Sequence, residues 1–194
     1  DFDFEFAEAK KINKVLNYLA RTFPETTPEL KQGNVISLYI IISMLLEKYA
    51  IPNYETKIGK WFIDFERKRF ADLDLPEDQR DSEMVAYQNA VGHSSDAIES
   101  LDYRNKILAR EFFSTFDEIL PLDDTREFSN EQKLAIFRRD KGFCQLKKKC
   151  TGRKLGWDDD WHIDHKIAFS KGGKTTVVNG QLACAECNLA KGND

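Results

Sequence analysis

Residues 161–192 read WHIDHKIAFSKGGKTTVVNGQLACAECNLAKG, and this stretch indicates how the C-terminal part of the chain folds. Apolar and polar residues alternate from Trp161 to Ile167, which predicts a strand. Lys171–Lys174 contains two glycines and predicts a turn, and Thr175–Leu182 is rich in strand-forming residues. A short helix is expected from about Ala185. The predicted order is therefore strand, turn, strand and helix.

Four polar residues in this stretch would meet if the two strands formed a hairpin packed on the helix. Asp164 and His165 lie on the first strand, Asn179 on the second, and Asn188 at the start of the final helix. A hard divalent cation prefers oxygen ligands such as those of Asp164 and Asn188. The neutral imidazole of His165 is a suitable general base near pH 7. This set suits phosphodiester hydrolysis, although Asn179 before a glycine is also typical of a simple turn.

All four cysteines lie in the same part of the chain, at Cys144, Cys150, Cys184 and Cys187. Two close pairs in a chain without a secretory signal indicate metal binding before disulfides. The alternative is two buried thiols and a chance pair.

The charge is unevenly distributed along the 194 residues. Residues 1–128 carry 16 basic and 25 acidic side chains, whereas residues 129–194 carry 13 basic and 8 acidic ones. Only the C-terminal part therefore has the excess positive charge that is typical of a surface binding a polyanion. The longest apolar stretch, Val35–Leu46, is too short to span a bilayer and predicts a buried helix.

The remainder of the chain predicts helices followed by a linker. Apolar residues at helical spacing predict helices over residues 6–19, 35–49, 56–70 and 95–116, with a loop over residues 75–81 and His93 at the surface. Ser129 and Gln132 form a capping box for a helix that should run to about Asp140. We expect an α+β chain with a helical bundle region over residues 1–120, a linker over 121–128 and a small domain over 129–194.

Residues 128–193 resemble the HNH endonuclease family, which has the ββα-metal fold. The resemblance lies in FSNEQKLAIFRRDKGFCQ, IDH, SKGG and NGQLACAECNLAKG, which follow the family's order and spacing. It implies that His165 is the general base and that Asp164 and Asn188 bind Mg²⁺ or Mn²⁺. It also implies that Asn179 holds the loop between the strands and so orients the histidine. The implied activity is metal-dependent cleavage of DNA.

The same resemblance implies a structural Zn²⁺ held by the four cysteines. Cys184-x2-Cys187 matches the family pattern. Cys144-x5-Cys150 departs from it, because the usual first pair is separated by two residues. A wider loop can still close a tetrahedral site, so the place of Cys150 as fourth ligand stays open.

Several charged residues near the predicted site have competing interpretations. Lys171, Lys174 and Lys191 are expected to contact the DNA backbone, although each is also compatible with a solvated surface charge. His162 is interpreted as an ordinary strand residue rather than a phosphate or metal ligand. Residues 158–160, three consecutive aspartates, are expected in a solvent loop.

Two other functions compete with the nuclease hypothesis. One is a zinc-stabilised nucleic-acid-binding module without catalysis, and the other is a protein-interaction scaffold built on the acidic helical half. That half loosely resembles the region that joins a ParB-like domain to an HNH domain in prokaryotic restriction and phage-defence proteins. The resemblance implies an effector domain of a longer, cytoplasmic multidomain protein without a membrane partner. The oligomeric state, including a homo-oligomer, stays open.

Overall fold

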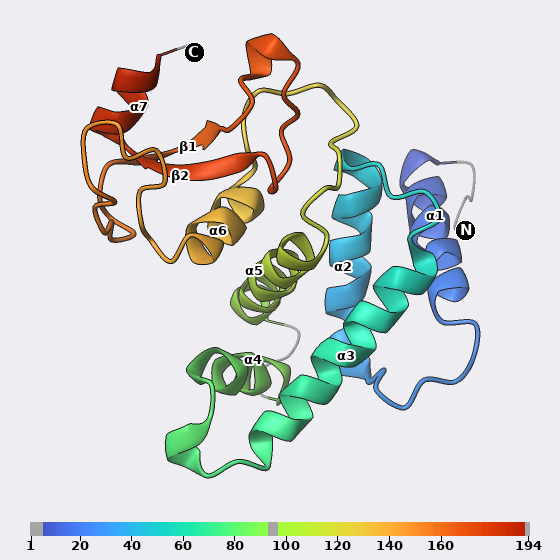
Figure 1. Ribbon diagram of the computed structural model, residues 1–194. Helices are drawn as coiled ribbons and strands as arrows, with labels where there is room; N and C mark the ends of the chain where they lie inside the picture. Colours follow the sequence, from blue (N-terminus) through green and yellow to red (C-terminus); the bar gives the residue numbers. More distant parts are fainter. Residues whose placement is uncertain (1–5, 93–96, 193–194) are drawn as a thin grey trace. The chain divides into compact units, whose positions relative to one another are not determined.

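The computed structural model describes residues 6–92 and 97–192. Over these residues the chain forms seven α-helices and one two-stranded antiparallel sheet, which confirms the predicted α+β class (Figure 1). It divides into two compact units. The first comprises residues up to Glu47 together with Ile51–Leu108, and the second comprises Lys48–Ala50 with the residues from Ala109 onward.

The first unit is helical. It contains α1 (Ala7–Thr22), α2 (Gln32–Lys48, except its last residue), α3 (Glu55–Leu73), α4 (Ser82–Gly92) and the first part of α5 (Ile98–Thr115). Helix α3 packs against both α1 and α4. The core of the first unit consists of apolar side chains at helical spacing, including Leu38, Ile42, Leu45, Ile58, Phe62 and Leu108. The helices predicted over residues 6–19, 35–49 and 56–70 are confirmed to within a few residues.

Helix α4 was not predicted from the sequence. Only Met84 and Tyr87 of this helix are buried, so its apolar residues form no continuous stripe. A local signal is nevertheless present, because Oδ1 of Asp81 accepts hydrogen bonds from the backbone N–H groups of Glu83 and Met84 at 2.8 and 3.3 Å. The predicted loop over residues 75–81 contains a short 3₁₀ helix, η1 (Glu77–Gln79). The helix predicted over residues 95–116 is confirmed as α5, whereas residues 93–96, which include His93 and the predicted start of that helix, lie outside the described residues.

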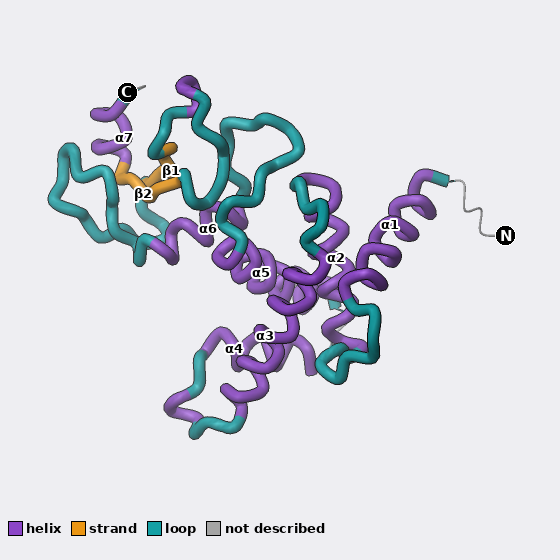
Figure 2. The backbone as a smooth tube through the Cα atoms, turned by 45° about the vertical axis from the view of Figure 1, so that its right-hand side comes forward, coloured by secondary structure: helices purple, strands orange, loops and turns teal. Residues whose placement is uncertain are grey.

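The second unit contains a hairpin with a helix on each side. Helix α6 (Asn130–Arg139) packs against strand β2 (Gly180–Cys184), and helix α7 (Ala185–Lys191) packs against β2 and β1 (Trp161–His165) (Figure 2). The strands pair in antiparallel register from Trp161 with Cys184 to His165 with Gly180. The predicted order of strand, turn, strand and helix is confirmed.

Helix α6 begins at the predicted capping box. The hydroxyl of Ser129 accepts a hydrogen bond from the backbone N–H of Gln132, and the Gln132 side chain accepts one from the backbone N–H of Ser129. At the other end of α6, the guanidinium of Arg139 donates to the carbonyls of Val177 and Gly180 at 2.6 and 2.7 Å. These bonds fix the loop before β2 against the helix.

The second strand is shorter and later than predicted. Residues 175–179 form a loop that ends in a turn over residues 177–179, rather than the first half of a strand. A Cβ at position 180 would lie 2.3 Å from Cδ1 of Ile136, so the glycine permits close packing of the strand on α6. The predicted turn at residues 171–174 follows the 3₁₀ helix η2 (Phe169–Lys171), and Gly172 there has a φ of +86°.

The residues predicted as a linker pack into the second unit. The backbone N–H of Leu122 donates to the carbonyl of Lys48, and the Lys174 ammonium lies 3.4 Å from the Asp124 carboxylate. Within the described residues, no helix combines the length and apolar character needed to cross a membrane.

Candidate active site and cysteine cluster

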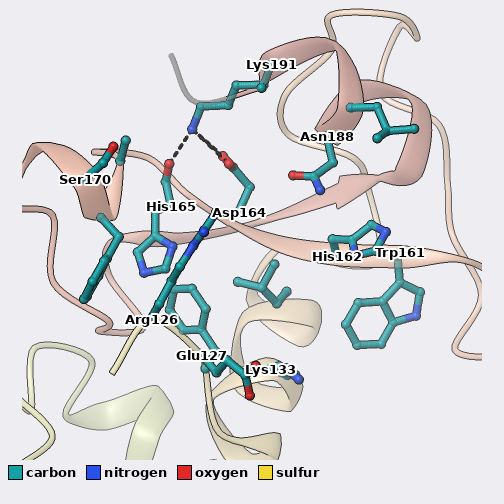
Figure 3. Close-up of a pocket in the computed structure, with 16 residues that line it drawn as sticks. Arg126, Glu127, Lys133, Trp161, His162, Asp164, His165, Ser170, Asn188 and Lys191 are labelled. Carbon is teal, nitrogen blue, oxygen red and sulfur yellow. Dashed lines mark hydrogen bonds and ion pairs between the residues drawn. The ribbon is translucent and has the colours of Figure 1, made fainter. Parts of the chain in front are cut away.

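A pocket of about 1020 Å³ opens between the hairpin, α7 and the segment that precedes α6 (Figure 3). Three of the four predicted catalytic residues, Asp164, His165 and Asn188, line it. The fourth, Asn179, lies in the loop between the strands and does not line the pocket. The hairpin and the helix thus bring together three of the four residues that were expected to meet, although Asp164 and Asn188 lie 24 positions apart.

Asp164 is held by two polar side chains. Its carboxylate accepts a hydrogen bond from Nε2 of Gln181 at 2.8 Å, and Gln181 is its partner in the strand register. The ammonium of Lys191 lies 2.8 and 2.9 Å from the two carboxylate oxygens. The side chains of Asp164 and Lys191 are only 11% and 10% exposed, so their ion pair is protected from solvent.

His165 forms the inner wall of the pocket. The residue is 8% exposed, and its ring packs against Phe128 and Phe169, with ring centroids 4.5 and 5.9 Å away. Nε2 lies 3.1 Å from the hydroxyl of Thr175. Burial lowers the pKa of His165 below its usual value, and the neighbouring carboxylate of Asp164 partly opposes this effect. The imidazole is therefore neutral near pH 7, as a general base must be.

Asn179 holds the loop between the strands. Its Nδ2 donates to the carbonyls of Ile167 and Lys174 at 3.1 and 2.9 Å, while its Oδ1 accepts from the backbone N–H of Ile167 at 2.9 Å. These three bonds span the loop that follows His165. Both interpretations from the sequence, a residue that orients His165 through the loop and a turn residue, account for these bonds.

Asn188 completes the oxygen donors of the pocket. Its amide projects from the first turns of α7 into the space beside Asp164 (Figure 3). A carboxylate that already holds one cationic group, together with an amide in the same pocket, suits a divalent cation that keeps several water ligands. The donor set fits such an ion, provided that Lys191 gives up its contact with Asp164.

The three lysines predicted to contact DNA lie in different environments. Lys171 is exposed at the end of η2. Lys174 is also exposed, and it pairs with Asp124. Lys191 instead lies against Asp164, and its ammonium also donates to the carbonyl of His165 at 2.5 Å. The structure thus gives Lys191 an intramolecular partner that its position in the sequence does not reveal.

The other residues discussed from the sequence are exposed. His162 is half-exposed at the mouth of the pocket, with Nε2 3.5 Å from the Asp160 carboxylate. Residues 158–160 are exposed, as expected of a solvent loop.

Sequence reasoning missed three residues around the pocket. Arg126 and Lys133 line it, from the predicted linker and from α6. Thr175 lies behind His165 and is 2% exposed. No local pattern marks Arg126 or Lys133 as functional. Thr175 lies in the loop between the turn glycines and Asn179, and the orientation of its side chain follows only from the folded loop.

The four cysteines form one cluster. Their sulfur atoms all lie within 4.8 Å of one another, and Sγ of Cys150 lies 3.6 Å from Sγ of Cys187. Four thiolates around a Zn²⁺ with bonds of about 2.3 Å stand roughly 3.8 Å apart, so the cluster fits a zinc site. Cys150 takes the fourth position despite its unusual spacing from Cys144. Within the longer loop Lys147 adopts a positive φ of 51°, and Gly152, two residues after Cys150, has a φ of 97°.

Hydrogen bonds from the backbone support thiolates in this cluster. The N–H of Lys149 lies 3.1 Å from Sγ of Cys187, and the N–H of Arg153 lies 3.4 Å from Sγ of Cys150. The backbone N–H groups of Arg153 and Gly152 lower the pKa of Cys150 to about 6. Burial instead raises the pKa of Cys184, and a bound cation would favour the loss of its proton.

Comparison with known proteins identifies one family. Residues 144–194 match the family model described as HNH endonuclease. The match includes the cysteine cluster, both strands, the intervening loop and α7. No curated protein and no solved structure matches the chain.

Proposed function

We propose that the second unit is a metal-dependent DNA endonuclease of the HNH type, with His165 as its general base. One observation carries the proposal: Asp164, His165 and Asn188 line a single pocket that is large enough for a phosphodiester. A carboxylate, an amide and a neutral imidazole around one cavity are the groups that hydrolysis of such a bond requires.

In this mechanism His165 accepts the proton of a water molecule that attacks the phosphorus. A new P–O bond forms, the bond from phosphorus to the 3′ oxygen breaks, and the 3′ oxygen leaves. Burial favours the neutral imidazole, and the aromatic rings of Phe128 and Phe169 restrict its orientation. A base held in place in this way accelerates proton transfer by about 10²- to 10⁴-fold.

Asp164 and Asn188 would hold the divalent ion, which when bound supplies positive charge to offset the charge that develops on the phosphate. Gln181 orients Asp164 by its 2.8 Å hydrogen bond. Asn179 keeps the loop after His165 closed. Arg126 and Lys133 supply positive charge to the pocket wall and would contact phosphates, together with the exposed Lys171 and Lys174.

The cysteine cluster would hold a Zn²⁺ that is structural rather than catalytic. It lies at the junction of β2, α7 and the segment after α6, within an apolar core that includes Leu155 and Leu182. Because Cys187 and Asn188 are consecutive on α7, the zinc would fix the helix that presents the amide to the pocket.

Nicking of supercoiled plasmid by the purified chain tests the proposal. Cleavage is expected with Mg²⁺ or Mn²⁺ and not with excess chelator. His165→Ala should lower the nicking rate by about 10²-fold or more, whereas His162→Ala, three positions earlier on the same strand, should retain most of it. If His165→Ala cleaves at the parent rate, the assignment of the base is wrong.

A specific observation favours the second candidate, a zinc-stabilised nucleic-acid-binding module without catalysis. Both oxygens of Asp164 already contact Lys191, and His165 is nearly buried. Salt-dependent DNA binding without cleavage under any divalent ion would favour this function. The division into domains at residues 120 and 129, the cytoplasmic location and a role in restriction or phage defence stay proposals that rest on the sequence.

A further inference from the structure

A threonine hydroxyl connects the imidazole of His165 to the segment before α6. Nε2 of His165 lies 3.1 Å from Oγ1 of Thr175, and Oγ1 of Thr175 in turn donates to the carbonyl of Thr125. Thr175 is 2% exposed, so water does not compete for its hydroxyl. The three groups form a continuous hydrogen-bond chain from His165 through Thr175 to Thr125.

The chemistry of these groups fixes the direction of both hydrogen bonds. A hydroxyl carries one proton, and a carbonyl can only accept, so the Thr175 proton is used on Thr125. Oγ1 can then only accept from His165, which places the ring proton on Nε2. In the neutral imidazole Nδ1 therefore carries the lone pair. The atom that can take a proton is the one that does not contact Thr175.

Thr175 is held in place by the start of α6 and by the loop. Its carbonyl accepts a hydrogen bond from Nε2 of Gln132 at 3.0 Å, and Gln132 is the capping-box residue of α6. Asn179 bonds the carbonyl of the preceding Lys174 at 2.9 Å. Gln132 of α6 and Asn179 of the loop thus fix the backbone at Thr175. The fixed backbone sets the position from which the Thr175 hydroxyl reaches His165.

We propose that Thr175 is a positioning residue for the general base, whose hydroxyl keeps His165 in the Nε2–H tautomer and leaves Nδ1 to accept the proton of water. This inference rests on the nuclease function proposed above. It assigns to Thr175 no contact with the substrate, so its removal should affect turnover and not DNA binding.

Three variants separate the hydroxyl from the shape of the side chain. Thr175→Val removes the hydroxyl and keeps the volume, and Thr175→Ser keeps the hydroxyl. Thr176→Val is the matched control, because Thr176 is the neighbouring threonine and is also buried, at 4% exposed. Circular dichroism and zinc content show whether each variant keeps the fold.

Two readouts are needed. The first is the ¹⁵N spectrum of ¹⁵N-histidine-labelled protein, in which the chain's three histidines are assigned with single alanine variants and the tautomer of His165 is read directly. The second is the split between kcat and KM on a DNA oligonucleotide. For Thr175→Val we expect a mixture of tautomers and a kcat reduced by about tenfold to a hundredfold, with KM unchanged. Thr175→Ser should restore both, and Thr176→Val should match the parent.

The outcomes distinguish this inference from the proposed function. If the parent protein shows the Nδ1–H tautomer, or if Thr175→Val keeps the parent tautomer and kcat, the role of Thr175 is overturned while the nuclease proposal stands. If Thr175→Val loses its fold, the role of Thr175 is still tested by the tautomer of His165 in the parent and by the tautomer and kcat of Thr175→Ser. If the parent cleaves no DNA, the nuclease function fails, and the spectrum alone tests the hydrogen-bond chain.

Discussion

The ammonium of Lys191 lies 2.8 and 2.9 Å from the two carboxylate oxygens of Asp164, in a pair that is almost buried. The pair joins the last turn of α7 to the end of β1. It places a positive charge on the carboxylate that the sequence assigns to a divalent ion. The lysine and the ion therefore compete for the same oxygens.

Removal of this ammonium should strengthen metal binding in the absence of DNA. Lys191→Met keeps much of the side-chain length and leaves Asp164 with an uncompensated charge, which raises its affinity for a cation. We expect Mn²⁺ to bind several-fold more tightly, as measured by calorimetry. Lys171→Met, which alters an exposed lysine, serves as the control and should bind like the parent. Equal or weaker binding by Lys191→Met would show that the ion does not displace the lysine.

Variants of His165 and Asn188 should have different effects on metal binding and on catalysis. Asn188→Ala removes a ligand, so both Mn²⁺ affinity and plasmid nicking should fall. His165→Ala removes the base but no ligand, so nicking should fall by about 10²-fold or more while Mn²⁺ affinity is kept. Calorimetry and a nicking assay on the same preparations measure both. A loss of Mn²⁺ affinity in His165→Ala would instead make the histidine a ligand.

Cys150 should be a zinc ligand. Cys150→Ser should lower the zinc content below one ion per chain, and the melting temperature should fall, because the free energy of zinc binding contributes to folding. Cys150→His, which retains a possible ligand, is the matched control and should keep more zinc. Elemental analysis and thermal unfolding measure the two effects. Full zinc content in Cys150→Ser would restrict the site to three cysteines.

Arg126 should contribute to binding of the DNA backbone. Arg126→Ala removes one positive charge from the pocket wall, so affinity should fall and the slope of log K against log salt should decrease by about one. The control is Arg21→Ala, an exposed arginine of α1 that pairs with Glu55. Fluorescence anisotropy over a range of salt concentrations measures both. An unchanged slope would place Arg126 outside the DNA contact.

Local patterns in the sequence were sufficient for the order of the main elements of the second unit and for the starts of α6 and β1. A capping box joins residues three positions apart, so the start of α6 at Ser129 and Gln132 was predictable. Strand alternation has a period of two, so β1 was predictable as well. Helix α4 was not, because its few buried residues produce no stripe. Residues 175–179 were predicted as strand from their composition, whereas they form a loop that Asn179 ties to Ile167 and Lys174.

The candidate site divides in the same way between sequence and fold. The sequence alone identified the candidate metal ligands and general base, which are Asp164, His165, Asn188 and the cysteines. It could do so because metal binding and proton transfer require particular types of side chain, whatever surrounds them. The pairing of Lys191 with Asp164 and the hydrogen-bond chain from His165 through Thr175 to Thr125 are not. These contacts join residues 10 to 50 positions apart, and they exist only because strand register, the loop held by Asn179 and the packing of α6 set the side-chain directions. Hydrogen bonds and ion pairs depend on ångström-scale geometry, which no periodicity in a sequence encodes.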